Sequence, residues 1–276
     1  MTVLSTTDVR ALLTEHGLRP SRALGQNFLA DPNTATRIAR LAGVGHGDRV
    51  LEIGPGLGSL TLALAATGAS VLAIELDRRL VAVLESVLAA SPEVIVEQGD
   101  ALNVDFARRL GDGPWSCVSN LPYNVATPVV VRLLDDVPQV TTLLVMVQRE
   151  VGERLAAVPG SRVAGAVSIR VAYHAVARVV GSVPAAVFIP RPKVESVLVR
   201  LDRRPVPAVD VPSPDFMFEL VRTGFAQRRK MLRRALRPAL GSRVVEVLAA
   251  AGIDPHARAE SLDLEAWAAL SKEAAT

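Results

Sequence analysis

The chain has 276 residues, a formal net charge of +3 and hydrophobic side chains at half of its positions, so it is long enough to bury a large core and a smaller one. Cys117 is the only cysteine and the four histidines are scattered, which excludes internal disulfides and argues against a metal site. Residues 1–17 lack the apolar core of a signal peptide, and no apolar run reaches the roughly 20 residues of a membrane span, so we expect a cytoplasmic, metal-free protein.

The first 45 residues have the pattern of amphipathic helices, interrupted by RPSRALGQNFL at residues 19–29. Apolar strands and helices of 10–15 residues then alternate. The expected strands lie at residues 48–56, 70–77, 93–100, 115–120 and 141–148, and the expected helices at 59–68, 78–90 and 149–157. This alternation predicts an α/β fold with a mostly parallel sheet and helices on both faces.

Two later apolar stretches, residues 177–183 and 196–204, predict an antiparallel pair of strands at the edge of the sheet. The segment RRPVPAVDVPSP that follows has four prolines in twelve residues, which is typical of a linker. Only helical patterns come after it. We therefore predict two domains, residues 1–206 and a small helical domain of residues 207–276.

Ligands of such sheets bind beyond the carboxyl ends of the strands, and several unusual residues of this chain fall there. Gly54, Gly56 and Gly58 follow the first strand, where glycine lets a ligand approach the backbone. Glu75 ends the second strand, in the position from which a carboxylate accepts hydrogen bonds from both hydroxyls of a ribose. Asp100 ends the third strand and is expected beside an adenine ring, although a helix N-cap would also explain it.

The spacing of these glycines favours S-adenosylmethionine as the cofactor. It is Gly-x-Gly-x-Gly rather than the Gly-x-Gly-x-x-Gly of dinucleotide sites, and Glu52 precedes it by two residues. S-adenosylmethionine has no pyrophosphate and does not need the full phosphate-binding turn. An NAD-dependent enzyme is the second interpretation.

The fourth strand ends in Asn120-Leu121-Pro122-Tyr123, which suits the methylation of an adenine amine. That amine is a poor nucleophile because its lone pair is delocalised into the ring. The Asn120 side-chain oxygen and the Leu121 carbonyl can accept its two hydrogens, with Pro122 fixing the turn. Tyr123 offers a ring on which an extruded base can stack, worth about 1–3 kcal/mol. A plain asparagine turn with a packing tyrosine is the alternative.

A basic segment predicts contact with nucleic acid. Eight basic side chains and no acidic one lie between Leu220 and Val245. We expect the part from Arg228 to Arg237 to present a helical row to RNA phosphates, with Arg22 as a further contact. A solvated helix face would explain the same charges. The residues predicted to bind RNA are Arg22, Arg228, Arg229, Lys230, Arg233, Arg234 and Arg237.

These segments together resemble the bacterial small-subunit ribosomal RNA adenine N6,N6-dimethyltransferases, whose loss confers kasugamycin resistance. The resemblance covers nearly the whole chain. It rests on GQNFL (25–29), EIGPGLGSLT (52–61), IELD (74–77), GDAL (99–102), NLPYN (120–124), QREVGERL (148–155), FIPRPKVES (188–196) and FAQRRKMLRRAL (225–236). Ser119 departs from the pattern, since many relatives have glycine there.

The resemblance implies a Rossmann-like class I methyltransferase with a seven-stranded sheet. Nothing in the chain demands a protein partner, so we expect a monomer. It implies a cofactor pocket completed by Asn27, Leu29, Gly54, Glu75, Asp100 and Asn120. Phe188 would flank the target base opposite Tyr123. The implied reaction transfers four methyl groups to two adjacent adenosines in the 3′-terminal hairpin loop of 16S rRNA, on a late precursor of the small subunit.

Three other functions stay open. The related macrolide-resistance methyltransferases modify an adenine of the large-subunit RNA, but the NLPYN form and the long basic tail favour the small-subunit enzyme. A DNA adenine methyltransferase would need a separate target-recognition domain, for which the length leaves no room. A ribosome-assembly checkpoint that binds RNA is a further alternative. A version without catalysis is expected to lack Asn120 or Tyr123, and both are present.

Overall fold

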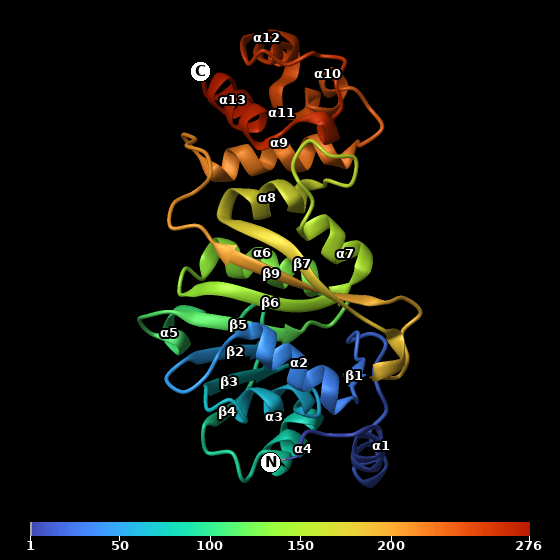
Figure 1. Ribbon diagram of the computed structural model, residues 1–276. Coiled ribbons are helices and arrows are strands. Elements are labelled where there is room, and N and C mark those ends of the chain that lie inside the picture. The colour runs from blue at the N-terminus through green and yellow to red at the C-terminus, as the bar shows by residue number, and fades with distance from the viewer. Residues whose placement is uncertain (1) are drawn as a thin grey trace. The chain divides into compact units, whose positions relative to one another are not determined.

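Seven strands form the central sheet of the protein, in the order β4-β3-β2-β5-β6-β9-β7, in a computed structural model that describes residues 2–276 (Figure 1). Met1, the first residue of the predicted N-terminal domain, lies outside the described residues. The strands are β2 (Arg49–Ile53), β3 (Ser70–Glu75), β4 (Val94–Gln98), β5 (Trp115–Asn120), β6 (Val140–Gln148), β7 (Ala175–Val183) and β9 (Ser196–Arg203). The pairs from β4 to β6 are parallel and β6 pairs antiparallel with β9, which confirms the predicted fold class.

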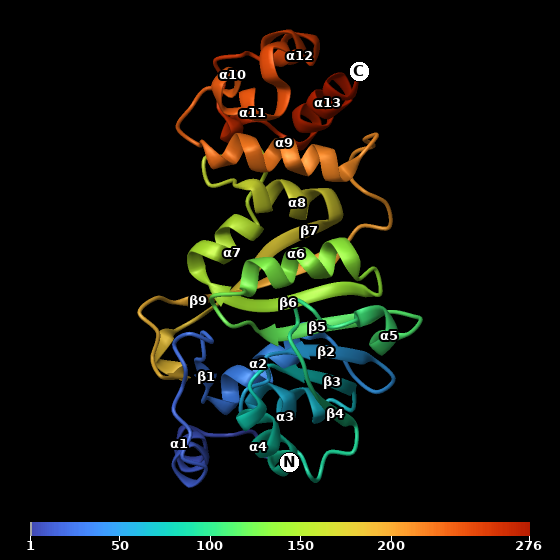
Figure 2. The ribbon, with the colours of Figure 1, turned by 180° about the vertical axis from the view of Figure 1, so that it is seen from behind.

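Helices cover both faces of the sheet. Figure 1 shows α2 in front of the strands, and Figure 2, seen from behind, shows α6 there. The helices of this part of the chain are α1 (Thr6–Glu15), α2 (Pro32–Ala42), α3 (Ser59–Ala65), α4 (Arg78–Val87), α5 (Phe106–Leu110), α6 (Ala126–Asp136) and α7 (Arg149–Leu155). Ile38 of α2 and Leu64 of α3 pack with Val50 and Val118 of the sheet in one buried cluster. The apolar strands and amphipathic helices thus bury each other, as their sequence patterns predict.

A small second sheet lies outside the predicted pattern. Strand β1 (Phe28–Leu29) pairs antiparallel with β8 (Phe188–Ile189), so that Leu29 lies opposite Phe188. A short 3-10 helix, η1 (Ala185–Val187), precedes β8. This pairing fixes the N-terminal segment beside the loop that leads into β9.

The chain divides into two compact units. One contains the chain through Gly152 together with Arg178–Asp202, and the other contains Glu153–Ala177 with Arg203–Thr276. The second unit therefore includes a segment far from the predicted boundary at residue 207, in addition to the residues that follow it.

The second unit is built from helices around its own core. They are α8 (Ala166–His174), α9 (Pro214–Ala226), α10 (Leu232–Ala235), α11 (Arg237–Leu240), α12 (Val244–Ala250) and α13 (Leu264–Ala275), with short 3-10 helices η2 (Gly241–Arg243) and η3 (Ala259–Ser261). Trp267 is wholly buried at the centre, with Phe218 and Leu220 of α9. Tyr173 of α8 joins the same cluster, which explains why residues 153–177 belong to this unit.

Candidate active site

The topology of the sheet creates a crevice between β2 and β5. From β2 the chain proceeds to β3 and β4 on one side, and then returns to β5 and β6 on the other. The pairing of β2 with β5 covers Val50 opposite Ser116 and Leu51 opposite Cys117, and it does not continue to the strand ends. Such a reversal of strand order is where α/β sheets bind their ligands.

One cavity at this crevice is lined by nearly all of the residues predicted to bind the cofactor or to act in catalysis. Its lining is drawn from the N-terminal segment and from the ends of four strands, β2, β3, β4 and β5. The predicted cofactor and catalytic residues in it are Asn27, Leu29, Gly54, Gly56, Glu75, Asp100, Asn120, Leu121, Pro122 and Tyr123. Residues that the sequence analysis grouped by their positions at strand ends therefore line one cavity, and their roles there stay predictions.

Phe188 is the exception, because it does not line the cavity. Its side chain is 2% exposed and packs in the core cluster that contains Leu29 and Leu198. Its backbone is held by the pairing of β8 with β1, in which Phe188 lies opposite Leu29. A contact of Phe188 with the target base stays a prediction.

The glycine turn after β2 packs directly against the turn after β5. Gly54 has φ +69°, and a Cβ atom there would lie 3.1 Å from Cδ of Pro122. A side chain at this position would be strained and would press on the proline ring. Glycine thus allows the two turns, and the residues they carry, to lie close together.

Glu75 is buried at the cavity wall and is held by the backbone. Its Oε2 accepts from the Gly56 N–H at 3.1 Å and its Oε1 from the Asp77 N–H at 2.9 Å. Burial raises the pKa of this carboxyl, and the two N–H groups act in the opposite direction. An ionised carboxylate has about four acceptor sites, so two remain for a pair of ligand hydroxyls.

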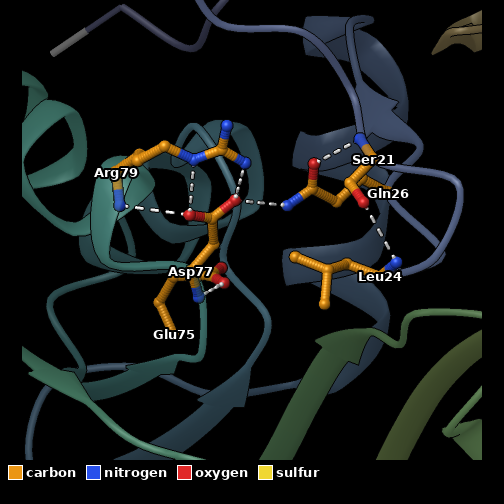
Figure 3. Close-up of polar contacts among 6 residues, drawn as sticks. All are labelled: Ser21, Leu24, Gln26, Glu75, Asp77 and Arg79. Carbon is orange, nitrogen blue, oxygen red and sulfur yellow. Dashed lines mark hydrogen bonds and ion pairs between the residues drawn. The ribbon is translucent and has the colours of Figure 1, made fainter.

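A polar network ties the N-terminal segment to the end of β3 (Figure 3). The Gln26 amide donates to Asp77 at 3.1 Å and accepts from the Ser21 N–H at 2.8 Å. Arg79 donates to both Asp77 oxygens, and its hydrogen bonds hold the pKa of Asp77 at about 2. Gln26 lies in the GQNFL segment, but its role was not predicted, because nothing in one sequence pairs it with a residue 51 positions away.

The turn after β5 holds the same N-terminal segment from the other side. Asn120 donates from Nδ2 to the Asn27 carbonyl at 3.1 Å, and Asn124 donates from Nδ2 to the Ala23 carbonyl at 2.8 Å. A carbonyl oxygen only accepts, so the Asn27 carbonyl engages the nitrogen of the Asn120 amide. The Asn120 Oδ1 atom is not used by this bond. Gly25 makes the approach possible, since a Cβ atom there would lie 2.5 Å from Oδ1 of Asn124.

Tyr123 is held at its hydroxyl end. Its Oη lies 2.6 Å from Oγ of Ser196, a fully buried residue at the start of β9. Burial raises the pKa of the Tyr123 phenol, so the hydroxyl stays protonated at neutral pH. Ser196 ends the FIPRPKVES segment, but its contact with Tyr123 was not predicted.

Asp100 lines the cavity and also closes its own turn. Its Oδ1 accepts from the Leu102 N–H at 2.9 Å, and its Oδ2 accepts from Nδ2 of Asn103 at 2.6 Å. Asp100 therefore caps a turn and not a helix, since the N-cap of α5 is Asp105, and it forms part of the cavity wall.

Three polar side chains lie in the sheet close to the crevice. Glu52 is 1% exposed and does not line the cavity, and burial raises its pKa to about 8. Ser119 accepts from the Ile53 N–H at 2.9 Å, where backbone pairing between β2 and β5 has ended. The Cys117 Sγ lies 3.5 Å from the Ser119 hydroxyl. Burial raises the pKa of the Cys117 thiol to about 12. Ser119, the residue before Asn120, is thus hydrogen-bonded to Ile53, the residue before Gly54.

The structure corrects the predicted row of basic residues. Helix α9 ends at Ala226, a turn covers Gln227–Arg229, and two four-residue helices, α10 and α11, follow, so Arg228–Arg237 is not one helix. Arg228 is engaged within its own unit, by Glu260 at 2.8 Å and by the carbonyls of Arg162 and Ala164. Its guanidinium therefore has a structural role within the unit, and its contact with RNA stays a prediction.

Three arginines of the same segment surround a shallow hollow. Arg233, Arg234 and Arg237 line it together with Ser242. The Nε of Arg233 is buried and has no hydrogen-bond partner among residues 2–276. Arg229, Lys230 and Arg22 are exposed, Arg22 lying in the turn that precedes Gly25. These side chains place positive charge at the surface of the protein.

Two kinds of feature are absent from the described chain. Among residues 2–276 there is no group of three or more His, Cys, Asp or Glu side chains placed to hold a metal ion. Within the same residues, no helix has the length and apolar character needed to cross a membrane.

Comparison with known proteins gives a consistent result. The family model described as ribosomal RNA adenine dimethylase matches residues 18–276. A relative from Moorella thermoacetica, ribosomal RNA small subunit methyltransferase A, is 47% identical and aligns over 95% of each chain. The protein of the same name from Nocardia farcinica is 46% identical over 99% of this chain and 96% of its own.

Solved structures share the fold. The 23S rRNA methyltransferase ErmE is 27% identical with a TM-score of 0.67, over 91% of this chain and 100% of its own. A dimethyladenosine transferase from Plasmodium falciparum is 24% identical with a TM-score of 0.71, over 88% of this chain and 95% of its own.

Proposed function

Because this chain belongs to the ribosomal RNA adenine dimethylase family, we propose that it methylates two adjacent adenosines in the 3′-terminal hairpin loop of 16S rRNA. Each adenosine receives two methyl groups on N6, on a late precursor of the small ribosomal subunit. The observation that carries the proposal is the single cavity that joins Glu75 to the Asn120–Tyr123 turn. A group suited to bind a nucleoside and a group suited to activate an amine lie in the same wall.

S-adenosylmethionine is the cofactor that this wall fits. The two acceptor sites left on Glu75 suit the two ribose hydroxyls, and the Gly54 turn offers backbone without side chains. Asp100 at the end of the next strand would border the adenine, and Asn27 and Leu29 would close the pocket from the N-terminal side. When bound, the cofactor supplies a methyl group activated by a sulfonium.

The residues after β5 prepare the amine for attack. In the first transfer to each adenosine, the Oδ1 of Asn120 and the Leu121 carbonyl would accept the two N6 hydrogens, which would turn the nitrogen lone pair toward the methyl group. The cofactor would supply the methyl group and leave as a neutral thioether, and the proton lost by the amine would pass to solvent water. In the second transfer one N6 hydrogen remains, so only one of these two acceptors would be used. Tyr123 would stack on the extruded base. Positioning and hydrogen bonding account for this activation without a strong base.

The arginine hollow supports contact with RNA. Arg233, Arg234 and Arg237 line the hollow, and their guanidinium groups bind phosphates well because of their planar, multidentate form. Arg229, Lys230 and Arg22 would add further phosphate contacts at exposed positions. Duplex RNA is recognised mostly through its shape and phosphates, which this set of side chains suits.

The large-subunit alternative rests on the fold shared with ErmE. That likeness is 27% identical, whereas the small-subunit relatives reach 46–47% over almost the whole chain. The small-subunit substrate is therefore preferred.

One experiment separates these substrates. The protein and a methyl-labelled cofactor are incubated with small subunits from a strain that lacks this modification, and in parallel with large subunits and with DNA. We expect label on the two adjacent adenosines of the small-subunit RNA and none with the Asn120→Ala variant. Label on the large subunit would support the alternative, and RNA binding without any label would support a checkpoint protein.

A further inference from the structure

We propose that Ser196 is a positioning residue for the reaction, which holds the ring of Tyr123 in the orientation that stacks on the target base. The inference rests on the proposed function and adds to it a residue that does not line the cavity. It starts from the contact between the Tyr123 and Ser196 hydroxyls, whose oxygens are 2.6 Å apart.

The two hydroxyls differ in how firmly they are anchored. Ser196 is fully buried and is the first residue of β9, where it lies opposite Gln148 of β6. The preceding residue, Glu195, accepts from the Arg149 N–H at 3.0 Å and forms an ion pair with the Arg149 side chain. Ser196 is therefore held by the sheet and by the contacts between its neighbour Glu195 and Arg149.

Tyr123, in contrast, lies in an irregular segment. It follows Pro122, whose ring fixes the backbone, and Leu121, whose side chain is 1% exposed. These neighbours hold the Cα end of the tyrosine. Its side chain still has two rotatable bonds, and the bond to Ser196 is the only side-chain hydrogen bond found for Tyr123 among residues 2–276.

Fixing the hydroxyl end fixes the axis of the ring, which runs through Cβ and Oη. A ring whose axis is held at both ends cannot swing away from the cavity it lines, and the base that stacks there meets it at a fixed place. The amine of that base must meet Asn120 and the methyl group in line, and small displacements of reacting atoms are costly. Ser196 would act on the reaction through this ring, without touching the substrate.

The alternative is that the hydroxyl pair only satisfies two buried polar groups. Removal of either hydroxyl would then change stability and leave the methyl-transfer step unchanged. The two explanations differ in what happens to the transfer rate at saturating substrate.

A double-mutant cycle on methylation of small subunits distinguishes them. The variants are Ser196→Ala, Tyr123→Phe and the double variant, with the single-turnover rate, the cofactor Kd and the melting temperature measured for each. Tyr123→Phe keeps the aromatic ring and leaves the β9 backbone intact, so the cycle remains readable if Ser196→Ala folds poorly. Each single variant should lower the rate about five- to tenfold, the loss expected for one hydrogen bond, with the cofactor Kd within about twofold of wild type.

The double variant should be no slower than the slower single variant, because both changes remove the same bond. Ser196→Thr, which retains the hydroxyl, should restore most of the rate. Losses that multiply in the double variant, or rates unchanged in both single variants, would overturn the inference. Failure of the wild-type protein to methylate small subunits would count against the proposed function instead, and the two results are therefore distinguishable.

Discussion

The nitrogen and the oxygen of the Asn120 side-chain amide have different roles. Its nitrogen holds the Asn27 carbonyl at 3.1 Å, and its oxygen is proposed to accept from the target amine. Asn124, in the same turn, holds the Ala23 carbonyl in a similar way but has no proposed part in the chemistry. The pair allows the structural and the catalytic contributions of an asparagine to be separated.

Asn120→Ala should lower the methyl-transfer rate about 10²–10³-fold, the range seen when one preorganised hydrogen-bonding group is removed from an active site. The cofactor Kd should rise less than the rate falls. Single-turnover kinetics and titration calorimetry measure the two effects. Asn124→Ala is the matched control, and an equal loss of rate in both variants would argue against the acceptor role of Asn120.

Glu75→Ala should weaken cofactor binding by roughly 10–100-fold, since hydrogen bonds to a charged group contribute about 1.5–3 kcal/mol. Calorimetry with the cofactor alone measures this, and no RNA is needed. Glu85→Ala changes the same charge at an exposed position of α4 and should leave the affinity unchanged. Unchanged binding in Glu75→Ala would refute the ribose assignment.

The sequence predicted which residues line the cavity, but not the hydrogen bonds that hold them in place. Glycines and carboxylates at strand ends identify the pocket because parallel strands end on one edge of the sheet. The contacts of Gln26 with Asp77 and of Ser196 with Tyr123 join residues 51 and 73 positions apart. No local pattern reports such pairs, and the pairing of Phe188 with Leu29 joins residues that lie still farther apart in the chain.

Among the elements, buried strands were predictable and the basic segment was not. A strand in a parallel sheet is apolar along its length, and each one in this chain is bounded by turn residues. Helix α9, however, is followed by the C-cap residue Gln227 with φ −118° and ψ 50°, without the glycine or proline that usually marks a helix end. The charged residues after it kept a helical pattern across a turn, which is why one helix was expected.

The arginine hollow gives a prediction about salt. Replacing Arg233, Arg234 and Arg237 one at a time by alanine should reduce the slope of log affinity for RNA against log salt by about 0.7–0.9 for each phosphate that is no longer neutralised. Filter binding or fluorescence anisotropy over a range of salt concentrations measures the slope. Arg10→Ala, an equal charge change at an exposed site on α1, should leave it unaltered. Three unchanged slopes would remove the hollow from the interface.

Considered as a whole, the molecule depends on contacts between distant parts of the chain. The proline-rich linker marks one end of the second unit, but residues 153–177 belong to that unit through Tyr173 and its neighbours in the core. Composition cannot reveal an early segment that packs with a late one. The predicted boundary at residue 207 lies within the linker, whereas packing divides the chain at Arg203 and also at the two ends of residues 153–177.

The buried carboxyl of Glu52 should make global stability depend on pH. Burial raises its pKa from 4.5 to about 8, so the folded protein keeps a proton that the unfolded chain releases between these values. The associated stabilisation is fully present below pH 4.5 and is lost progressively as the pH rises to about 8. In this window the free energy of unfolding of wild type, relative to Glu52→Gln, should fall by about 1.4 kcal/mol per pH unit.

Urea denaturation of both proteins across that window measures the difference. Glu85→Gln, at an exposed position, serves as the control and should show a constant offset from wild type. A constant offset for Glu52→Gln as well would mean that this carboxyl titrates in the folded protein as it does in the unfolded chain.

The reactivity of Cys117 reports how often the centre of the sheet opens to solvent. This cysteine is the only thiol of the chain, it lies fully buried on β5 beneath the crevice, and its pKa of about 12 keeps it in the unreactive protonated form. An alkylating reagent can therefore modify the protein only during the moments when the centre of the sheet opens. Mass spectrometry of the intact protein would measure the rate of that modification. A ligand that stabilises the sheet should lower this rate by making local opening rarer.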